Sequence, residues 1–142
     1  MVNLVPLPVI SAIFKKEVLK FGESEQPDKP GTIKFAEFTI EKRAFTLQES
    51  AHEHQFFFNE AMSFVINCAS QEEVDYYWEK LSADPKAEQC GWLKDKYGIS
   101  WQVVPTGLHE VMNDPDKEKV ARKIKAFLKM KKINLEELEV IK

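Results

Sequence analysis

Three histidines, two cysteines and several carboxylates are the side chains of this 142-residue chain that could do chemistry. His52 and His54 lie two residues apart, beside Glu49 and Glu53. Residues two apart on an extended segment share a face, so both imidazoles could reach one metal ion, although a third ligand must come from elsewhere. His109, the remaining histidine, lies in a predicted linker. The favoured interpretation of the cluster is therefore a polar loop.

Cys68 is the candidate nucleophile. It ends a predicted strand just before Ser70, which begins a helix, and a helix N-terminus lowers the pKa of a nearby thiol. The sequence marks no general base beside Cys68, and the favoured interpretation is a thiol that packs in the core. The chain contains no GxGxxG or GK[ST] run and no serine nucleophile elbow. The sequence therefore identifies no catalytic residue, and it leaves open whether the protein is an enzyme.

The composition is that of an ordinary globular domain, with 44% apolar and 30% charged residues. The net charge of −3 gives no overall field that favours a nucleic acid or a membrane surface. No apolar run approaches the roughly 20 residues that a membrane-spanning helix needs, and residues 1–10 lack the basic region of a secretory signal. Cys68 and Cys90 form no CxxC pair, so we expect reduced thiols and a cytoplasmic protein.

Basic residues gather near the C-terminus and raise the question of a nucleic-acid partner. They surround an apolar stripe that predicts an amphipathic helix beginning at Asp114-Pro115. The buried stripe consists of Val120, Ile124, Phe127 and Leu128. The basic side chains then form the solvated face of the helix, so no nucleic-acid partner is expected. They are Lys117, Lys119, Arg122, Lys123, Lys125, Lys129, Lys131 and Lys132.

The clearest predicted element is a β-hairpin with its turn at Glu41-Lys42. Apolar side chains alternate with polar ones on both arms, as in a sheet that is covered on one side. The turn places Phe38 opposite Phe45. The same register places Ala36 opposite Leu47 and gives the hairpin one apolar face.

A strand, a helix and a second hairpin are predicted over residues 61–104. Ser70 is a good N-cap for the helix, and Glu73 completes a capping box. The helix ends at Asp84-Pro85, and the following hairpin turns at residues 95–98. The buried stripe of the helix consists of Val74, Tyr77, Trp78 and Leu81. Strands and helices in this order, with the helices on one face, predict an α+β fold.

The two ends of the chain show weaker patterns. Residues 1–10 form a candidate extended segment, but Pro6 and Pro8 lack donors and restrict it to a sheet edge or a loop. A short strand is predicted over residues 17–21. At the other end, Asn134 is predicted to cap a last helix that carries Leu135, Leu138 and Ile141.

Four runs of the sequence carry a family resemblance: residues 58–68, 71–75, 77–81 and 90–105. They resemble the second module of the PhnB-like branch of the glyoxalase/bleomycin-resistance/dioxygenase (vicinal oxygen chelate) superfamily, a group often labelled 3-demethylubiquinone-9 3-methyltransferase. The resemblance extends from Gly31 to the C-terminus. It implies an α+β fold of paired βαβββ modules around a concave pocket, in a homodimer.

The resemblance also implies how the chain is divided. A first module is expected over residues 1–55, a second over residues 56–107 and a C-terminal helical extension over residues 108–142, together in one structural domain. The family's opening strand and the front of its first helix have no clear counterpart before Phe21. The first module is therefore expected to be atypical or incomplete at its N-terminus, which leaves a sheet edge open to a partner chain.

Metal-dependent members of the superfamily offer a histidine near the start of the second module's first strand and a glutamate on its last strand. The resemblance places Ala61 and Gln102 at these two positions. An alanine has no lone pair, and a neutral amide is a poor substitute for a carboxylate on a divalent ion. We therefore expect no metal and no other cofactor.

The ligand pocket is predicted from the alternation of side chains along the strands of the second module. Phe64 and Trp101 have the parity to face the helices, and Trp92 is expected to pack across the hairpin from Trp101. The residues expected to face the concave side are Ala61, Ser63, Val65, Ser100 and Gln102.

The leading functional hypothesis is a metal-free homodimer that binds a small, partly apolar molecule. The alternative is a glyoxalase- or dioxygenase-like enzyme, or an isomerase or lyase of the same fold, on an unidentified small metabolite. A third hypothesis is a protein-interaction role through the open N-terminal edge. Methyl transfer is disfavoured, because a methyltransferase of the Rossmann type needs a glycine-rich loop and a parallel sheet.

Overall fold

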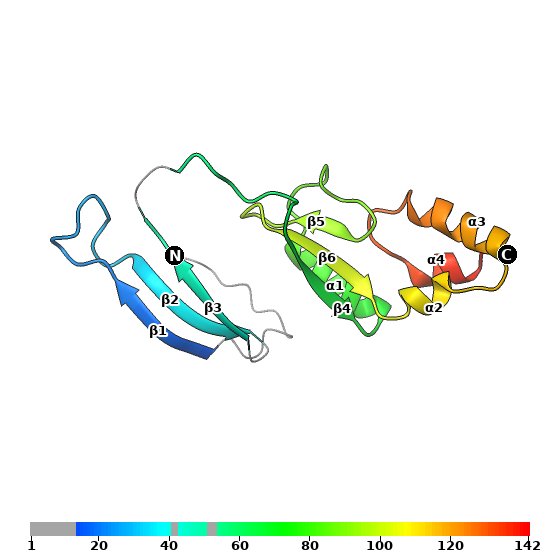
Figure 1. Cartoon of the computed structure of the whole chain (residues 1–142), viewed down its shortest axis with the longest axis horizontal. Helices are drawn as coiled ribbons and strands as arrows, with labels where there is room; N and C mark the ends of the chain where they lie inside the picture. The colour runs from blue at the N-terminus through cyan, green and yellow to red at the C-terminus, as the bar shows by residue number, and fades with distance from the viewer. Residues whose placement is uncertain (1–13, 41–42, 51–53) are drawn as a thin grey trace. The chain divides into compact units, whose positions relative to one another are not determined.

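The computed structural model describes residues 14–40, 43–50 and 54–142 and has an α+β fold (Figure 1). The chain divides into two compact units, Met1–Phe56 and Phe57–Lys142. No helix in these described ranges is long and apolar enough to cross a bilayer. The strands are β1 (Phe14–Lys20), β2 (Ile33–Ile40), β3 (Arg43–Gln48), β4 (Ser63–Cys68), β5 (Trp92–Lys94) and β6 (Ser100–Pro105). The helices are α1 (Gln71–Leu81), α2 (Leu108–Met112), α3 (Lys117–Phe127) and α4 (Leu135–Glu139).

The first unit contains an antiparallel sheet in the order β1-β2-β3. Its hairpin has the predicted register, with Phe38 opposite Phe45 and Ala36 opposite Leu47. The rings of Phe38 and Phe45 stack with their centroids 5.7 Å apart. The alternation of apolar and polar side chains determines this pairing, because a slip of one residue would turn the apolar side chains to the other face.

Two predictions for the first unit, the turn at residues 41–42 and the extended segment over residues 1–10, lie outside the described residues. The strand predicted over residues 17–21 is found as β1, which begins earlier and pairs with β2. Val18 lies opposite Ala36, so β1 extends the apolar face of the hairpin.

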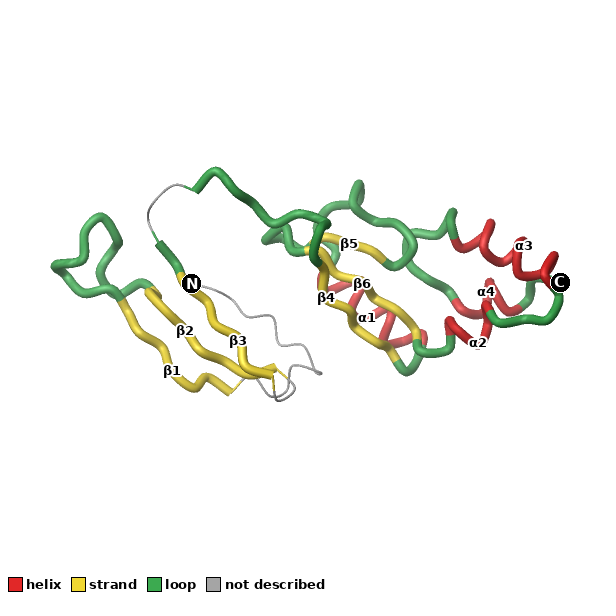
Figure 2. Tube along the Cα trace, in the orientation of Figure 1, coloured by secondary structure: helices red, strands yellow, loops and turns green. Residues whose placement is uncertain are grey.

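The second unit contains a sheet in the order β4-β6-β5 (Figure 2). In this sheet β4 and β6 are parallel, and β5 is antiparallel to β6. Helix α1 connects β4 to β5 and packs against one face of this sheet. One prediction here is wrong: Leu93, and not Trp92, lies opposite Trp101. The last pair before the hairpin turn is Lys94 with Ser100, and this register places Trp92 opposite Gln102.

Helix α1 begins as predicted, because Ser70 and Glu73 cap its N-terminus. The Ser70 Oγ accepts a hydrogen bond from the Glu73 N–H (3.3 Å), and the Glu73 carboxylate accepts one from the Ala69 N–H (2.7 Å). The helix ends at Leu81, before the predicted stop, because the backbone becomes extended at Ser82. Trp78 of the predicted stripe is half-buried, and the other members are buried: Val74, Tyr77 and Leu81.

The C-terminal residues form three helices, and two predictions for them are wrong. Helix α2 occupies part of the segment predicted as a linker. Helix α3 is capped by Asp116 rather than Asp114, because the Asp116 Oδ1 accepts hydrogen bonds from the first two helical N–H groups that follow Lys117. Asn134 caps α4 as predicted. The core of this region consists of Val111, Ile133 and Leu138.

The buried face of α3 also differs from the predicted stripe. Ile124 and Leu128 are exposed, whereas Lys123 is only 5% exposed. The Lys123 Nζ donates a hydrogen bond to the Val111 carbonyl oxygen near the C-terminus of α2 (2.7 Å). The aliphatic stem can therefore be buried while the ammonium group is paired. This partner on α2 sets the rotation of α3, and the periodicity of α3 alone does not reveal it.

Candidate functional site

The exposed face of the second sheet carries polar side chains that the alternation predicted. Val103 and Cys68 are buried on one face, which α1 covers, whereas Val65, of opposite parity, is 53% exposed. Ser63 shares the parity of Val65, and its Oγ accepts a hydrogen bond from the Gln102 Nε2 (2.8 Å). The open face of β4 and β6 therefore presents a linked hydroxyl and amide beside an apolar side chain.

A cavity of about 190 Å³ lies at the start of β4 and β6. Ser100 and Asn59 are its polar lining residues, and the rest of the lining is apolar or aromatic: Phe57, Phe58, Met62, Phe64 and Ile99. Ser100 is 2% exposed, and no described residue forms a hydrogen bond with its Oγ. A buried hydroxyl without a partner costs free energy, so a ligand group that bonds to it would bind favourably.

Polar contacts hold the segment that leads into β4. The Asn59 Oδ1 accepts a hydrogen bond from the Ala61 N–H (3.0 Å). Glu60 forms an ion pair with Lys94 of β5 (2.5 Å), and this hydrogen bond lowers the pKa of the Glu60 carboxyl. Phe57 remains exposed, so this segment forms a rim of the cavity rather than part of a closed core.

Four of the five predicted pocket residues come together on β4 and β6. Ser63 lies opposite Ser100, and Val65 lies opposite Gln102, across the parallel pair. Ala61 precedes β4 and is exposed. Side-chain alternation was sufficient to group the four, because the pairing of two strands brings residues of equal parity to one face.

The sequence did not predict that Phe57, Phe58 and Met62 line the cavity. Phe57 and Phe58 precede the predicted strand, and alternation carries information only within a strand. Met62 lay in the predicted strand, but β4 begins after it, at Ser63. The signal that was present is a run of three phenylalanines at residues 56–58, outside any predicted helix or strand. Exposed apolar patches of this kind mark binding surfaces.

The residues that the resemblance places at the superfamily's chelating positions do not fit a divalent metal ion. Ala61 has no donor atom in its side chain. The amide nitrogen of Gln102 is already bonded to Ser63, and a neutral amide oxygen is a weak ligand for such an ion.

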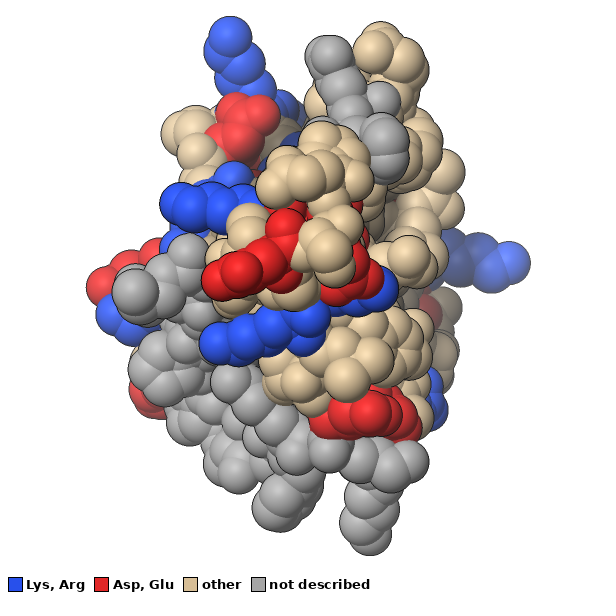
Figure 3. All heavy atoms as spheres, turned by 90° about the vertical axis from the view of Figure 1, so that its left-hand side faces the viewer, with Lys and Arg blue, Asp and Glu red and all other residues tan. Residues whose placement is uncertain are grey.

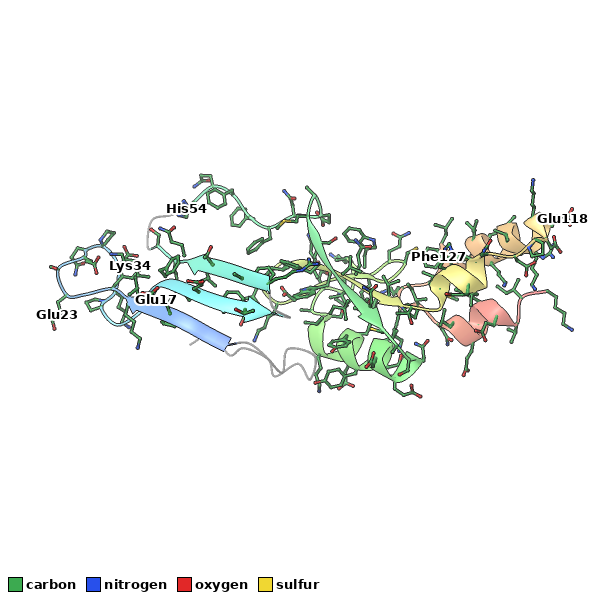
Figure 4. The ribbon with its side chains drawn as sticks, turned by 60° about the horizontal axis from the view of Figure 1, so that its bottom comes forward. Glu17, Glu23, Lys34, His54, Glu118 and Phe127 are labelled. Carbon is green, nitrogen blue, oxygen red and sulfur yellow. The ribbon has the colours of Figure 1, made fainter. Side chains whose placement is uncertain are left out.

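The predicted histidine cluster is only partly described. His52 and Glu53 lie outside the described residues. His54 lies on the segment before β4 (Figure 4), where its ring stacks on Phe56 with the centroids 4.8 Å apart. His109 is exposed on α2. In the part of the chain that the structure describes, no three His, Cys, Asp or Glu side chains are close enough to hold a metal ion together.

Cys68 packs in the core, as the favoured interpretation predicted. Its side chain is fully buried, and burial raises the pKa of the thiol to about 11, with the charge of Glu73 adding to the shift. Desolvation therefore outweighs any activation by the helix N-terminus.

We expect Cys68 to be nearly inert to alkylation in the folded protein. At mildly alkaline pH, a thiol with a pKa of about 11 carries roughly 100-fold less thiolate than one with the ordinary value. In a Cys90→Ser variant, the rate at which iodoacetamide labels Cys68 should increase about tenfold for each unit by which the pH is raised, as long as the pH stays below that pKa. Unfolding in urea should remove the protection, and an ordinary labelling rate in the folded variant would contradict this expectation.

The basic stretch near the C-terminus is partly neutralised by carboxylates. Lys119 pairs with Asp114 (2.7 Å), and Lys131 pairs with Glu88 (3.0 Å). Figure 3 shows a different face, the one at the left of Figure 1 where β1–β3 are drawn, and on it basic and acidic side chains are also interspersed. Cations that are paired in this way offer less charge to a phosphate backbone.

The chain is similar to known proteins over most of its length. The family model described as 3-demethylubiquinone-9 3-methyltransferase matches residues 10–104. Among solved structures, a PhnB protein from Bacillus cereus is 30% identical with a TM-score of 0.57, and the match covers 70% of this chain and 84% of that chain. No match is found among the curated proteins.

Proposed function

The chain belongs to the PhnB-like family and has the α+β fold of the glyoxalase superfamily. We propose that it binds a small, partly apolar molecule without a metal ion. The observation that carries the proposal is a mostly apolar and aromatic cavity whose lining includes Asn59 and Ser100, the latter with a buried hydroxyl that no described residue bonds. The adjoining open face contributes the remaining residues of the proposed ligand site: Ala61, Ser63, Val65 and Gln102.

The size and lining of the cavity define the class of ligand. A dry cavity of about 150 Å³ lined by Leu, Ile and Phe accommodates benzene, so about 190 Å³ has room for one aromatic ring with a substituent. The phenylalanines favour stacking with such a ring. The Ser100 hydroxyl can donate or accept a hydrogen bond, so we propose a single-ring ligand with one hydroxyl or carbonyl group.

Methyl transfer, which the family description mentions, is not part of the proposed function. A Rossmann-type methyltransferase binds its cofactor at a glycine-rich loop that follows a strand of a parallel sheet. The sequence has no GxGxxG run. Among the described strands, β4 and β6 form the one parallel pair.

We also propose that the protein acts as a homodimer in the cytoplasm. Both cysteines are free thiols, which is the state that a reducing compartment maintains. At β3 the first sheet ends in a strand that, within the described residues, pairs with β2 alone. An open edge of this kind favours association with a second chain.

The ligand proposal is tested by titrating the full chain with phenol and with toluene while recording amide chemical shifts. Both probes have one ring, but only phenol can form a hydrogen bond with Ser100. We expect both to shift signals of residues 57–64 and 99–102, with phenol binding about three- to tenfold more tightly, the effect of one net hydrogen bond. In a Ser100→Ala variant this preference for phenol should disappear.

Two phenylalanine variants provide a matched control. Phe57 lines the cavity, whereas Phe56 is similarly exposed and is not among the lining residues. Phe57→Ala should weaken the binding of both probes severalfold, and Phe56→Ala should leave it unchanged. A preference for phenol that survives in Ser100→Ala, or equal losses in the two phenylalanine variants, would show that the ligand site lies elsewhere.

A further inference from the structure

The two edges of the first sheet differ in chemistry. β1, at one edge, carries three lysines and a glutamate among seven residues, and charged edge strands discourage pairing with a further strand. β3, at the other edge, has Arg43 as its one charged residue. Within the described residues, β3 pairs with β2 alone. Among the described strands, β3 is therefore the edge of this sheet whose composition suits pairing with another strand.

The backbone groups at the free edge of β3 follow from its pairing with β2. The Glu49 N–H donates a hydrogen bond to the Lys34 carbonyl oxygen (3.2 Å), and the register of the two strands runs without a shift. In an antiparallel ladder, successive residues point their backbone groups to opposite sides. The odd-numbered residues of β3 therefore bond to β2, while Ala44, Thr46 and Gln48 direct their N–H and C=O groups outward.

The sequence of β3 complements itself in one antiparallel register, which is centred on Thr46. In this register Thr46 faces its own copy, and Ala44 faces Gln48 of the partner subunit, which gives about six backbone hydrogen bonds. Phe45 faces Leu47 of the partner subunit, so the apolar face of the sheet continues across the junction.

The charges at the two ends of β3 select this register. Arg43 and Glu49 are both exposed, and centring the pairing on Thr46 brings Arg43 opposite Glu49 of the partner subunit, twice in each dimer. A shift by two residues would place Arg43 opposite the partner's Leu47, or Phe45 opposite the partner's Glu49. Neither alternative keeps both the charge pairs and the continuous apolar face.

We propose that two copies of this chain pair along β3, antiparallel about a two-fold axis through Thr46, so that two three-stranded sheets become one continuous sheet. This inference rests on the proposed homodimer and identifies its interface. A two-fold interface uses the same patch on both subunits, as β3 does in this arrangement. The pairing also covers the edge that a lone three-stranded sheet leaves open.

A proline at position 46 tests the interface without breaking the sheet of one subunit. The Thr46 N–H points to the free edge, so Thr46→Pro removes a donor between subunits and keeps the hydrogen bonds to β2; proline is tolerated at such an edge position. Analytical ultracentrifugation across a concentration series should give Thr46→Pro a dimer dissociation constant at least about tenfold higher than that of the original chain. Thr46→Val, which keeps the N–H, should dimerise like the original chain.

A charge exchange tests the register itself. Arg43→Glu and Glu49→Arg each create two pairs of like charges in the dimer, so each variant alone should dimerise about three- to tenfold more weakly. An equimolar mixture of the two variants places opposite charges together again and should recover the original affinity as a heterodimer. Weak single variants with a recovering mixture support this register, and a mixture that fails to recover overturns it.

Oligomeric state and ligand binding distinguish this inference from the proposed ligand function. The cavity residues lie in Phe57–Lys142, so a Thr46→Pro monomer should still bind phenol. A chain that is monomeric at every concentration, or a dimer that Thr46→Pro leaves intact, overturns the β3 interface whatever the result with phenol. In the second case a Val65→Lys variant that dissociates the dimer would assign the interface to the open face of β4 and β6 instead.

Discussion

Replacing Gly91 with alanine is expected to lower the free energy of unfolding by about 3–5 kcal/mol. Gly91 has a φ of 85°, where a Cβ atom is strained. That Cβ would lie 2.8 Å from the Ile133 Cδ1 and 2.9 Å from the Val103 carbonyl oxygen. The carbonyl belongs to the backbone of β6 and cannot rotate away. The Gly91 N–H donates a hydrogen bond to the Lys131 carbonyl oxygen, and the Gly91 carbonyl oxygen accepts one from the Val103 N–H (both 2.8 Å), so both bonds oppose a shift of the segment.

Gly98→Ala is the matched control for this prediction. Gly98 also has a positive φ, of 81°, but nothing lies within 4 Å of the position of its Cβ. Its substitution should therefore cost only the backbone strain, about 1–2 kcal/mol. Both values are measured by urea unfolding followed by circular dichroism. Equal losses in the two variants would mean that the close packing around Gly91 does not contribute to stability.

Truncation of Ile133 to alanine is expected to cost about 2–5 kcal/mol of unfolding free energy. Ile133 is 1% exposed and forms the core of the C-terminal helices together with Val111 and Leu138. It also lies against Gly91, and therefore joins these helices to the sheet. Val140→Ala, at a side chain that is 73% exposed, should change stability by less than about 0.5 kcal/mol. Losses of similar size at the two positions would contradict the assignment of this core.

The two substitutions are also expected to be non-additive, because the nearest atom to a Cβ added at Gly91 is the Ile133 Cδ1. In a Gly91→Ala/Ile133→Ala double variant that contact is absent, so the combined loss should be smaller than the sum by about 1 kcal/mol or more. The close approach to the Val103 carbonyl oxygen remains, and the relief is therefore only partial. A strictly additive double variant would mean that residue 133 moves aside without cost.

Some features of the predicted site have causes within one strand, and others depend on residues that are distant in the chain. Alternation along the strands was enough to place Ser63 and Gln102 on one face, where the structure finds them hydrogen-bonded. It could not show that the Ser100 hydroxyl is buried without a described partner, since burial depends on side chains that pack there from outside the strand. The hydrogen bond from the Trp101 Nε1 to Asp95 (2.9 Å) was not predicted either, because the turn between β5 and β6 brings the two residues together.

By itself, the sequence determined the features whose causes lie within a few residues along the chain. The β2–β3 register follows from the side chains that alternate along both strands. The start of α1 follows from the hydroxyl of Ser70 and the carboxylate of Glu73. Membership of the PhnB-like family follows from runs of residues that resemble its second module.

Only the tertiary structure decided the features whose causes lie far apart in the chain. On α3, Lys123 is buried whereas the predicted Ile124 and Leu128 are exposed, because a carbonyl oxygen of another helix accepts the hydrogen bond of the lysine. Gly91 must lack a side chain because β6 and Ile133 approach it from distant positions. Contacts of this kind depend on how elements pack in space, and a pattern read along one element contains no information about its neighbours.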